Sequence, residues 1–373
     1  MSETECRWGF LGTAAIARKN WKAVRLSGNG RVVAIGGRDA GRTRRFVDEC
    51  QAEVPMGQAV DAVAYDALLG RDDIDAVYIP LPTGIRKDWV LKAAAAGKHV
   101  LCEKPVAIHA DDAEAMITAC RQAGVQFMDG VMFDHSTRLD AVRDAIADAE
   151  SFGRLRRIQT HFSFAADDSF VAENIRAQRQ LEPHGCLGDL GWYCIRMTLW
   201  AAGGELPEEV TARTLMAIRG GQSDGEVPGD FSAEMRFAGG VTANFFCSFF
   251  SVNQQTATFS GDRGYLTVND FVLPFYDAEL KWEQHRHVLA IDNCRWNFGR
   301  HTRNLGVPEY ASGEANAQEV RMVRRLGEIA ISGQLDDRYP ELTLKTQRIL
   351  DACRRSDAAG GIPVRLSPDG PAD

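Results

Sequence analysis

Apolar, β-branched segments alternate with helix-compatible segments through the first third of the chain, and this alternation restricts the fold more than any other feature. An apolar run at 7–11 breaks at Gly12-Thr13-Ala14, a helix-compatible segment covers 15–26, and a second apolar run follows at 31–36. Later strand patterns cover 75–80, 99–103 and 125–132, and later helical patterns cover 40–52, 85–96 and 111–122. Repeated strand–helix units with short connections predict a parallel sheet covered by helices on both faces. We therefore expect an N-terminal Rossmann domain, the doubly wound α/β arrangement, over residues 1–133.

Beyond residue 133 the pattern changes to alternating polar and apolar residues. Such runs cover 155–164, 230–237, 241–250 and 265–268, and helical patterns at 320–331 and 342–353 accompany them. Alternation over short runs is typical of antiparallel strands with one buried face. We predict a C-terminal α/β domain over 134–373 with a large, open, mainly antiparallel sheet. Because the free face of such a sheet needs cover, we expect that cover to come either from self-association, as a homodimer or homotetramer formed through the sheet, or from the helices at 320–331 and 342–353.

The charge and the cysteine content of this 373-residue chain favour a reducing compartment and a small-molecule partner. The net charge of −8 argues against nucleic acid and anionic membranes, which attract basic surfaces. The apolar run at 245–252 is too short to span a bilayer, and residues 1–7 lack the organisation of a secretory signal, so we expect a cytoplasmic protein. Nine cysteines without a CxxC pair predict reduced thiols and no metal site. His285 and His287 are expected on one exposed face of a strand.

The break after the first strand resembles a dinucleotide-binding turn. Ligands of doubly wound sheets lie at the carboxyl ends of the strands, and Gly12 opens a match to the fingerprint G-x-G-x-x-G/A in which Ala14 replaces the middle glycine. Small residues there allow the backbone to approach a pyrophosphate at the positive end of the next helix. We assign this role to Gly12, Thr13, Ala14, Ala15 and Ile16. An ordinary tight turn between a strand and a helix is the alternative.

The end of the second strand predicts the choice of cofactor. An acid there would bind the ribose hydroxyl of NAD, but Gly37 occupies that position, and Arg38 and Arg42 can bind a 2′-phosphate. We therefore expect NADP(H) in preference to NAD(H). Two alternatives stay open, namely that these are solvated basic residues at a helix start and that Asp39 is a ribose ligand. The segments that follow two later strands complete the predicted cofactor site with Leu81, Pro82, Thr83, Glu103 and Lys104.

The segment LPTGIRKDWVLKAAAAGKHVLCEKP, at 81–105, resembles a known family. Glycine-lysine-histidine followed by glutamate-lysine-proline at this spacing is the signature of the Gfo/Idh/MocA family, which includes glucose–fructose oxidoreductase and inositol dehydrogenase. The opening GFLGTAAIAR, the run SGDRGYLTV at 260–268 and the ending at 321–366 are also similar to that family. The resemblance implies an oxidoreductase with an N-terminal Rossmann domain and a C-terminal α/β domain whose open sheet frequently mediates dimerisation.

A tyrosine and a lysine are the predicted chemical pair. Asp189 and Tyr193 are four residues apart in a predicted helix over 187–202, so they share one helical face. Members of the family place Asp-x-x-x-His or Asp-x-x-x-Tyr here. A tyrosine with a pKa of ~10 is a poor base at neutral pH, and a nearby lysine ammonium lowers that pKa.

The predicted roles follow from this chemistry. We expect Tyr193 to act as the acid/base, Lys104 as its electrostatic partner and a donor to the reacting oxygen, and Asp189 as an orienter of a substrate hydroxyl or of the lysine. The alternatives are a surface lysine at a strand end, a half-buried core tyrosine and a helix-start carboxylate.

Several positions depart from the family pattern and border the expected substrate cleft. Arg86 replaces a histidine, Asp129 replaces a glutamate, and Phe133-Asp134-His135-Ser136-Thr137-Arg138 replaces a histidine-proline segment. Arg86 and Arg138 are either contacts to a substrate carboxylate or phosphate or surface arginines, and His184 is a candidate substrate contact. The role of His135 stays open.

The expected substrate is a sugar-like small molecule, with a secondary alcohol or ketone of a sugar, polyol or glycoside as the reacting group. Two alternatives are a non-catalytic NADP-binding regulator and a dehydrogenase of a non-sugar diol such as a dihydrodiol.

Overall fold

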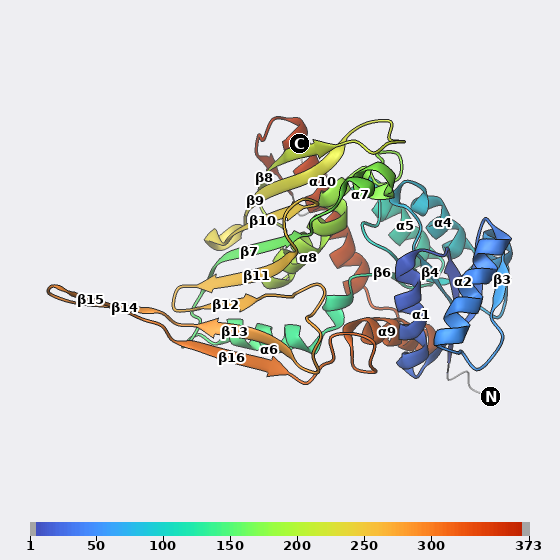
Figure 1. The fold of residues 1–373 in the computed structure, drawn as a ribbon, viewed down its shortest axis with the longest axis horizontal. Coiled ribbons are helices and arrows are strands. Elements are labelled where there is room, and N and C mark those ends of the chain that lie inside the picture. Colours follow the sequence, from blue (N-terminus) through green and yellow to red (C-terminus); the bar gives the residue numbers. More distant parts are fainter. Residues whose placement is uncertain (1–4, 368–373) are drawn as a thin grey trace. The chain divides into compact units, whose positions relative to one another are not determined.

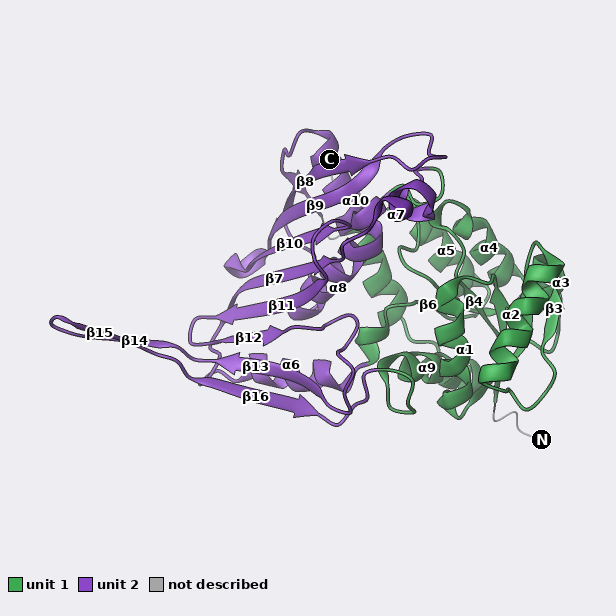
Figure 2. Ribbon diagram, in the orientation of Figure 1, with its two compact units in different colours: residues 1–135, 180–183, 312–348 green, residues 136–179, 184–311, 349–373 purple. Residues whose placement is uncertain are grey.

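The computed structural model describes residues 5–367, which form two compact units (Figure 2). Unit 1 contains the residues up to His135 together with Gln180–Pro183 and Ser312–Arg348. Unit 2 contains Ser136–Arg179, His184–Ala311 and the residues from Ile349 onward. Each unit therefore takes residues from more than one stretch of the chain.

Unit 1 is built on a six-stranded sheet in the order β3-β2-β1-β4-β5-β6, in which every pair is parallel. The strands are β1 (Cys6–Leu11), β2 (Gly30–Gly36), β3 (Asp61–Val63), β4 (Ala76–Ile79), β5 (His99–Cys102) and β6 (Phe127–Asp129). The connecting helices are α1 (Ala15–Ser27), α2 (Ala40–Glu53), α3 (Tyr65–Leu69), α4 (Thr83–Ala95) and α5 (Ala110–Gln122). The predicted doubly wound Rossmann fold is confirmed, and its strand order reverses between β1 and β4, where ligands of this fold bind.

Helix α9 (Gln318–Ser332) completes the core of unit 1. Its residues Val320 and Leu326 join Trp8 of β1 and Trp21 of α1 in one buried hydrophobic cluster. The sequence pattern placed this amphipathic helix in 134–373 with the second domain, whereas it packs with the first. The reason for the difference is that helical periodicity reveals an apolar face but not the surface that this face covers.

Unit 2 is built on a nine-stranded sheet in the order β16-β13-β12-β11-β7-β10-β9-β8-β17. The strands are β7 (Leu155–Ser163), β8 (Glu209–Ile218), β9 (Val227–Arg236), β10 (Thr242–Ser248), β11 (Gln254–Gly261), β12 (Tyr265–Val268), β13 (Leu280–His285), β16 (Thr302–Val307) and β17 (Val364–Arg365). Strands β7 and β10 run parallel, and the other neighbouring pairs are antiparallel. The predicted large, mainly antiparallel sheet is confirmed.

Helices cover one face of this sheet (Figure 1). Helices α6 (Thr137–Ala147) and α8 (Trp192–Ala201) pack there, and α10 (Arg338–Ala358) adds its residues from 349 on. The covered face is apolar, with buried residues such as Ile158 and Phe245, whereas the opposite face carries polar residues such as the exposed Gln159 and Glu234. Among the described residues, no helix combines the length and the apolar character needed to cross a membrane.

A two-stranded hairpin of β14 (Val288–Asp292) and β15 (Arg295–Gly299) projects from strands β13 and β16 of unit 2 (Figure 1). The sequence pattern did not predict it. The remaining short elements are α7 (Asp168–Glu173), η1 (Met132–His135), η2 (Ile175–Ala177), η3 (Leu187–Gly191) and η4 (Ala238–Gly240).

Candidate active site

The turn after β1 leads into an accessible N-terminus of α1. Gly12 adopts a φ of 125°, a conformation that favours glycine. Thr13 and Ala14 are partly exposed and Ala15 and Ile16 are exposed, so the N-terminus of α1 is open to an anion. Ala14 has an ordinary extended backbone, with φ −65° and ψ 154°, so this position does not need the usual glycine. The residues present therefore fit the predicted pyrophosphate site.

Gly37, directly after β2, has no room for a side chain. A β-carbon there would lie 1.8 Å from the hydroxyl oxygen of Thr43 in α2. Thr43 is buried, and its hydroxyl donates to the Asp39 carbonyl oxygen at 2.7 Å. The Asp39 carboxylate caps α2 by accepting from the Arg42 amide at 2.7 Å. The position where an NAD-binding protein would carry an acid thus has no side chain. Because the Asp39 carboxylate already caps α2, the structure favours this capping role over the alternative in which Asp39 binds a ribose.

Tyr65, the first residue of α3, is a cofactor-site candidate that the sequence pattern did not single out. Burial raises the pKa of its phenol, while the nearby guanidinium groups of Arg38 and Arg42 act in the opposite direction. Its hydroxyl oxygen lies 3.9 Å from where a β-carbon on Gly12 would be. Arg38, Arg42 and Tyr65 therefore gather beside the turn after β1. The signal that could have revealed Tyr65 is its place just beyond the carboxyl end of β3.

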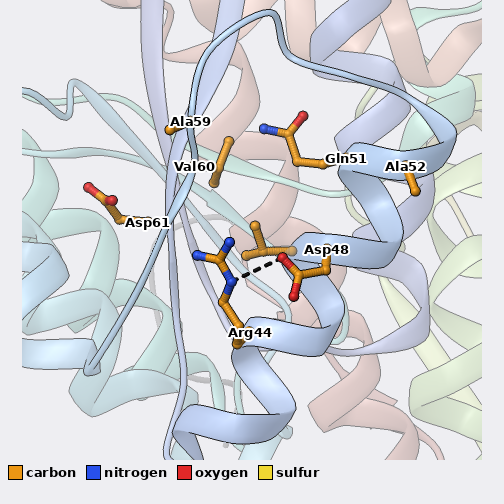
Figure 3. A pocket seen from close by; sticks show the side chains of 8 residues that line it. Arg44, Asp48, Gln51, Ala52, Ala59, Val60 and Asp61 are labelled. Carbon is orange, nitrogen blue, oxygen red and sulfur yellow. Dashed lines mark ion pairs between the residues drawn. The ribbon is translucent and has the colours of Figure 1, made fainter.

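A separate pocket of about 400 Å³ lies between α2 and the segment that leads into β3 (Figure 3). Its wall includes the ion pair of Arg44 and Asp48, whose Nε and Oδ1 atoms are 3.0 Å apart. The lining residues are Arg44, Val47, Asp48, Gln51, Ala52, Ala59, Val60 and Asp61. None of them is a predicted cofactor residue, so this pocket is distinct from the predicted site.

Thr83, at the start of α4, is held by an acid from a distant part of the sequence. Glu182 accepts hydrogen bonds from the Thr83 amide at 3.0 Å and from its hydroxyl at 2.6 Å. The Gly84 amide donates to the Leu181 carbonyl oxygen at 2.9 Å, and a β-carbon on Gly84 would lie 2.4 Å from the Gln180 carbonyl oxygen. The segment Gln180–Pro183 therefore packs directly against the start of α4. Because Thr83 is buried and already bonded, this geometry favours a structural role over its predicted contact with the cofactor.

Arg86 is buried, and its guanidinium donates hydrogen bonds to main-chain oxygens. Its Nε donates to the Leu81 carbonyl oxygen at 2.9 Å, and its Nη1 donates to the Pro105 carbonyl oxygen and to the Thr83 hydroxyl. Arg86 thereby joins the segment after β4 to the segment after β5. Leu81 is buried as well, whereas Pro82 is partly exposed. These contacts favour a positioning role for Arg86 over the substrate contact that the sequence suggested.

Lys104 follows β5 next to a buried acid. The Glu103 carboxylate accepts a hydrogen bond from the Tyr78 hydroxyl at 2.6 Å and another from the Lys104 amide at 3.2 Å. Burial raises the pKa of Tyr78 well above its usual value, and the neighbouring Glu103 raises it further, so the phenol stays a proton donor. Glu103 thus holds the main chain of Lys104, whose side chain is partly exposed at the carboxyl edge of the sheet.

In unit 2 the predicted helix at 187–202 begins with a π-helical turn. The turn η3 continues without a break into α8. Gly191 packs on β10, because a β-carbon there would lie 3.3 Å from Cys247 Sγ and 3.5 Å from the Phe245 ring. The absence of a side chain at Gly191 therefore allows this turn to pack closely against β10. Single π-helical turns occur frequently at functional sites, and this one contains Asp189.

Asp189 and Tyr193 each have a neighbour that the sequence pattern did not reveal. The Asp189 carboxylate pairs with Arg176, with 2.7 Å between Oδ2 and Nε. The half-buried Tyr193 ring packs edge-on against Phe162 at 5.8 Å between centroids, and Phe162 also contacts Phe271 at 6.4 Å. Arg176 therefore orients Asp189, and aromatic rings line the region beside Tyr193. Arg176 lies in an irregular segment around η2, where no periodic pattern could have linked it to Asp189.

His184 is an internal residue of unit 2. Only 4% of it is exposed, and its carbonyl oxygen accepts at 3.2 Å from the amide of Gly188, which lies in the π-helical turn. The next residue, Gly185, has a φ of 49°, and a β-carbon there would lie 2.2 Å from the Pro228 carbonyl oxygen. This burial favours a structural role over the predicted contact with substrate.

Arg138 forms a buried ion pair. Its Nη1 lies 2.5 Å from Asp270 Oδ1, its Nη2 donates to the Asp270 carbonyl oxygen at 2.9 Å, and the two side chains are 3% and 9% exposed. The other Asp270 carboxylate oxygen accepts from the Phe275 amide at 2.8 Å. His135 stacks on Tyr339 at 5.4 Å between ring centroids. Both residues have structural contacts in place of the substrate contacts considered for this segment.

The two histidines near the end of β13 take part in an aromatic cluster. His285 stacks on Tyr265 at 4.3 Å between centroids, and its ring nitrogens lie 2.8 Å and 3.0 Å from the hydroxyls of Thr267 and Thr302. Burial lowers the pKa of His285. The expectation of an exposed pair was wrong for His285, which neighbouring side chains bury on the polar face of the sheet. Within the described residues, no group of three or more metal-ligating side chains is present.

Two family models match this chain. One is described as "Oxidoreductase family, NAD-binding Rossmann fold" and matches residues 6–131, and the other is described as "GFO/IDH/MocA C-terminal domain" and matches 140–267. D-xylose 1-dehydrogenase (NADP(+)) 2 from Haloferax volcanii is 31% identical over 76% of this chain and 82% of its own length. The chain belongs to the Gfo/Idh/MocA family of oxidoreductases. The family predicted from the segment at 81–105 is therefore confirmed.

Other proteins extend the Gfo/Idh/MocA match over nearly the whole chain. A dTDP-3,4-didehydro-2,6-dideoxy-alpha-D-glucose 3-reductase from Actinomadura kijaniata is 28% identical over 93% of this chain and 94% of its own length. The crystal structure of a 3-ketoreductase from Actinomadura kijaniata, solved with NADP and TDP-benzene, has a TM-score of 0.78 at 27% identity and covers 95% of this chain and 98% of that one. Both units therefore share their folds with the Gfo/Idh/MocA family.

Proposed function

We propose that this Gfo/Idh/MocA protein transfers a hydride between NADP(H) and a secondary alcohol or ketone of a sugar, polyol or glycoside. The observation that carries the proposal is the gathering of Arg38 and Arg42 beside a Gly37 that cannot bear a side chain. The names of two relatives support it, since one is an NADP(+)-dependent xylose dehydrogenase and the other a reductase of a dTDP-linked sugar.

The cofactor-binding residues of the proposal lie in unit 1. The backbone of Gly12 and the residues up to Ile16 receives the pyrophosphate at the N-terminus of α1. Arg38 and Arg42 bind the 2′-phosphate, and Tyr65 contributes to the same end of the site. The bound nicotinamide supplies the hydride chemistry itself.

Replacing Arg38 by alanine is expected to weaken NADP(H) binding by about 10–100-fold, because a charge-assisted hydrogen bond to the 2′-phosphate is lost. NAD(H) lacks that phosphate, so its Kd is expected to change little. Fluorescence titration of both cofactors measures the two constants. Arg44→Ala is the matched control, since Arg44 lies in α2 and pairs with Asp48 at 3.0 Å. An equal loss for both cofactors, or no loss, would contradict this assignment.

The proton chemistry of the proposal rests on Tyr193. In the direction of reduction, Tyr193 gives its phenolic proton to the substrate oxygen as the carbonyl carbon is reduced, and in oxidation the phenolate takes that proton back. The Lys104 ammonium stabilises the phenolate and donates to the reacting oxygen. Asp189 orients a substrate hydroxyl, and Arg176 holds its carboxylate in place at 2.7 Å.

A non-sugar diol is the second candidate substrate, and the aromatic rings near Tyr193 favour it. Phe162 packs against Tyr193, and Phe271 contacts Phe162 in turn. A trans-1,2-dihydrobenzene-1,2-diol dehydrogenase from Sus scrofa is 28% identical over 71% of this chain and 74% of its own length. An apolar wall of this kind suits a ring without hydroxyl groups on every carbon.

Nicotinamide absorbance with a panel of substrates tests the proposed function. The panel contains sugars, polyols and their keto forms together with a dihydrodiol, and each compound is supplied with NADP(H) and with NAD(H). We expect turnover with at least one sugar-like compound and a higher kcat/KM with NADP(H). Turnover with the dihydrodiol alone would favour the second candidate. Tight binding of NADP(H) without turnover across the panel would overturn the proposal in favour of the non-catalytic regulator.

A further inference from the structure

A short apolar loop follows β12 and leaves two large side chains open to solvent. Leu273 is 53% exposed and Phe275 is 64% exposed, whereas Phe271 and Val272, just before them, are buried. Single exposed apolar residues are ordinary on protein surfaces, but neighbouring ones often mark a place where a ligand or a partner binds. We refer to residues 271–275 as the apolar loop.

Hydrogen bonds fix the main chain of the apolar loop at two points. The Asp270 carboxylate, which pairs with the buried Arg138, accepts from the Phe275 amide at 2.8 Å. The Gln255 side chain accepts from the Leu273 amide at 2.6 Å and donates to the Leu273 carbonyl oxygen at 2.5 Å. Both exposed side chains therefore project from a main chain that is already ordered. Binding a ligand to such a loop costs little further conformational entropy.

The apolar loop lies beside Tyr193 within unit 2. Gln255, which holds Leu273, is paired directly with Phe162 across strands β11 and β7. Directly paired residues place their side chains on the same face of a sheet, so Gln255 and Phe162 share one face. Phe162 packs against Tyr193 at 5.8 Å between ring centroids and against Phe271 at 6.4 Å. The loop thus continues the row of aromatic rings that begins at Tyr193.

The polar groups next to the apolar loop are already engaged by the protein. Both polar atoms of the Gln255 side chain bind the Leu273 main chain, so a sugar hydroxyl gains no ready partner there. The Asp270 carboxylate is held by Arg138 and by the Phe275 amide. Because the Arg138 side chain is only 3% exposed and paired, it offers no cation to a phosphate or carboxylate on a ligand. These contacts favour an apolar group as the occupant of this place.

We propose that the apolar loop binds an apolar substituent of the substrate, so that this protein acts on glycosides of alkyl or aryl alcohols in preference to free sugars. The inference rests on the proposed function, because it places the reacting hydroxyl at Tyr193 and the substituent of the same molecule at Leu273 and Phe275. Contact between the substituent and the loop removes apolar surface of both from water, which stabilises the complex. Two side chains form a much smaller surface than the about 800 Å² per partner of a stable protein interface, so a second protein is the poorer occupant.

Steady-state oxidation of methyl, butyl and phenyl β-D-glucosides and β-D-xylosides by NADP⁺, with the free sugars alongside, tests the proposal. We expect kcat/KM to rise at least about tenfold from the methyl to the phenyl glycoside, since each methylene group buried contributes up to about fourfold. The variant Leu273→Ser/Phe275→Ser is expected to bring this ratio close to one. The matched control is Leu289→Ser/Phe298→Ser in the hairpin of β14 and β15, where the same residue types are 48% and 70% exposed, and it is expected to keep the wild-type ratio.

Calorimetric titration in the presence of NADPH measures glycoside binding without turnover, because the reduced cofactor accepts no hydride. We expect the phenyl glycoside to bind at least about tenfold more tightly than the methyl glycoside in the wild type and in the control, and this difference to vanish in the Leu273→Ser/Phe275→Ser variant. Far-UV circular dichroism checks that each variant is folded.

The two measurements separate this inference from the proposed function. Turnover of free sugars and glycosides without any preference for the phenyl group would overturn the inference and leave the proposed function standing. Tighter binding of the phenyl glycoside without turnover would support the inference and count against the proposed function. A phenyl preference that the Leu273→Ser/Phe275→Ser variant retains would also overturn the inference, as would the absence of both binding and turnover with all six glycosides.

Discussion

Replacing Tyr193 by phenylalanine is expected to lower kcat by about 10²–10⁴-fold, because the variant loses the proton donor of the reduction and the base of the oxidation. NADP(H) binding is expected to stay unchanged, since the predicted cofactor residues lie in unit 1 and Tyr193 belongs to unit 2. The aromatic contact with Phe162 is kept by phenylalanine, so the fold around α8 is preserved. Steady-state absorbance with the best substrate of the panel measures kcat, and fluorescence titration measures cofactor binding.

Lys104→Met extends the same test to the electrostatic partner. We expect a loss of about 10²–10³-fold in kcat, as for the removal of a donor that stabilises charge on a reacting oxygen. If Tyr193 and Lys104 act as one unit, the double variant loses much less than the product of the two single losses. Tyr276→Phe and Lys92→Met are the matched controls, because Tyr276 is 99% exposed and Lys92 pairs with Asp66 on the surface. Turnover close to the wild type in both single variants would remove Tyr193 and Lys104 from the chemistry.

Arg138→Met is expected to destabilise unit 2 by about 3–5 kcal/mol, because it leaves the Asp270 carboxylate buried without its cation. The measured quantity is the midpoint of urea unfolding followed by circular dichroism, which should fall clearly below that of the wild type. The double variant Arg138→Met/Asp270→Asn removes both charges and is expected to recover part of the loss.

The control for the buried pair is an exposed one in the same unit. Arg156 and Asp262 lie 3.4 Å apart, with side chains 53% and 35% exposed. Arg156→Met is expected to cost at most about 1 kcal/mol. Equal effects of Arg138→Met and Arg156→Met would show that burial does not strengthen the first pair.

The fold of both sheets could be predicted because its signals are local. The apolar runs that became β1, β2, β4 and β5 and the glycines that end α1 and α4 are read within a dozen residues of sequence. The same is true of the turn at Gly12, where the chain passes directly from a strand to a helix. Where several such units follow one another, chain topology leaves few alternatives.

The partners of the candidate residues could not be predicted, because they come from distant, irregular segments. Glu182 reaches Thr83 across 99 positions of sequence, and Arg176 reaches Asp189 from a short 3₁₀ turn. Arg86 stood out in the sequence as a departure from the expected family pattern, yet its guanidinium donates to main-chain oxygens that no sequence pattern reveals. Polar contacts of this kind depend on tertiary packing, which periodicity does not encode.

The hairpin of β14 and β15 was not predicted, and helix α9 was predicted but assigned to the second domain, for a related reason. The alternation in 288–299 is that of a half-buried strand, yet its large apolar side chains are exposed in the structure. For α9 the sequence showed an apolar helix face, but it did not show that this face packs against the core of unit 1. A hydrophobic pattern predicts that a face is buried, but only the structure shows which surface buries it.

The packing of Gly37 against Thr43 also constrains how this protein could evolve a different coenzyme preference. An aspartate introduced at position 37 alone would place its β-carbon 1.8 Å from the hydroxyl oxygen of the buried Thr43, so this side chain would have to shift and the variant is expected to be destabilised. A smaller residue at position 43 would remove this contact. Changing position 43 before position 37 is therefore the less destabilising order of the two substitutions.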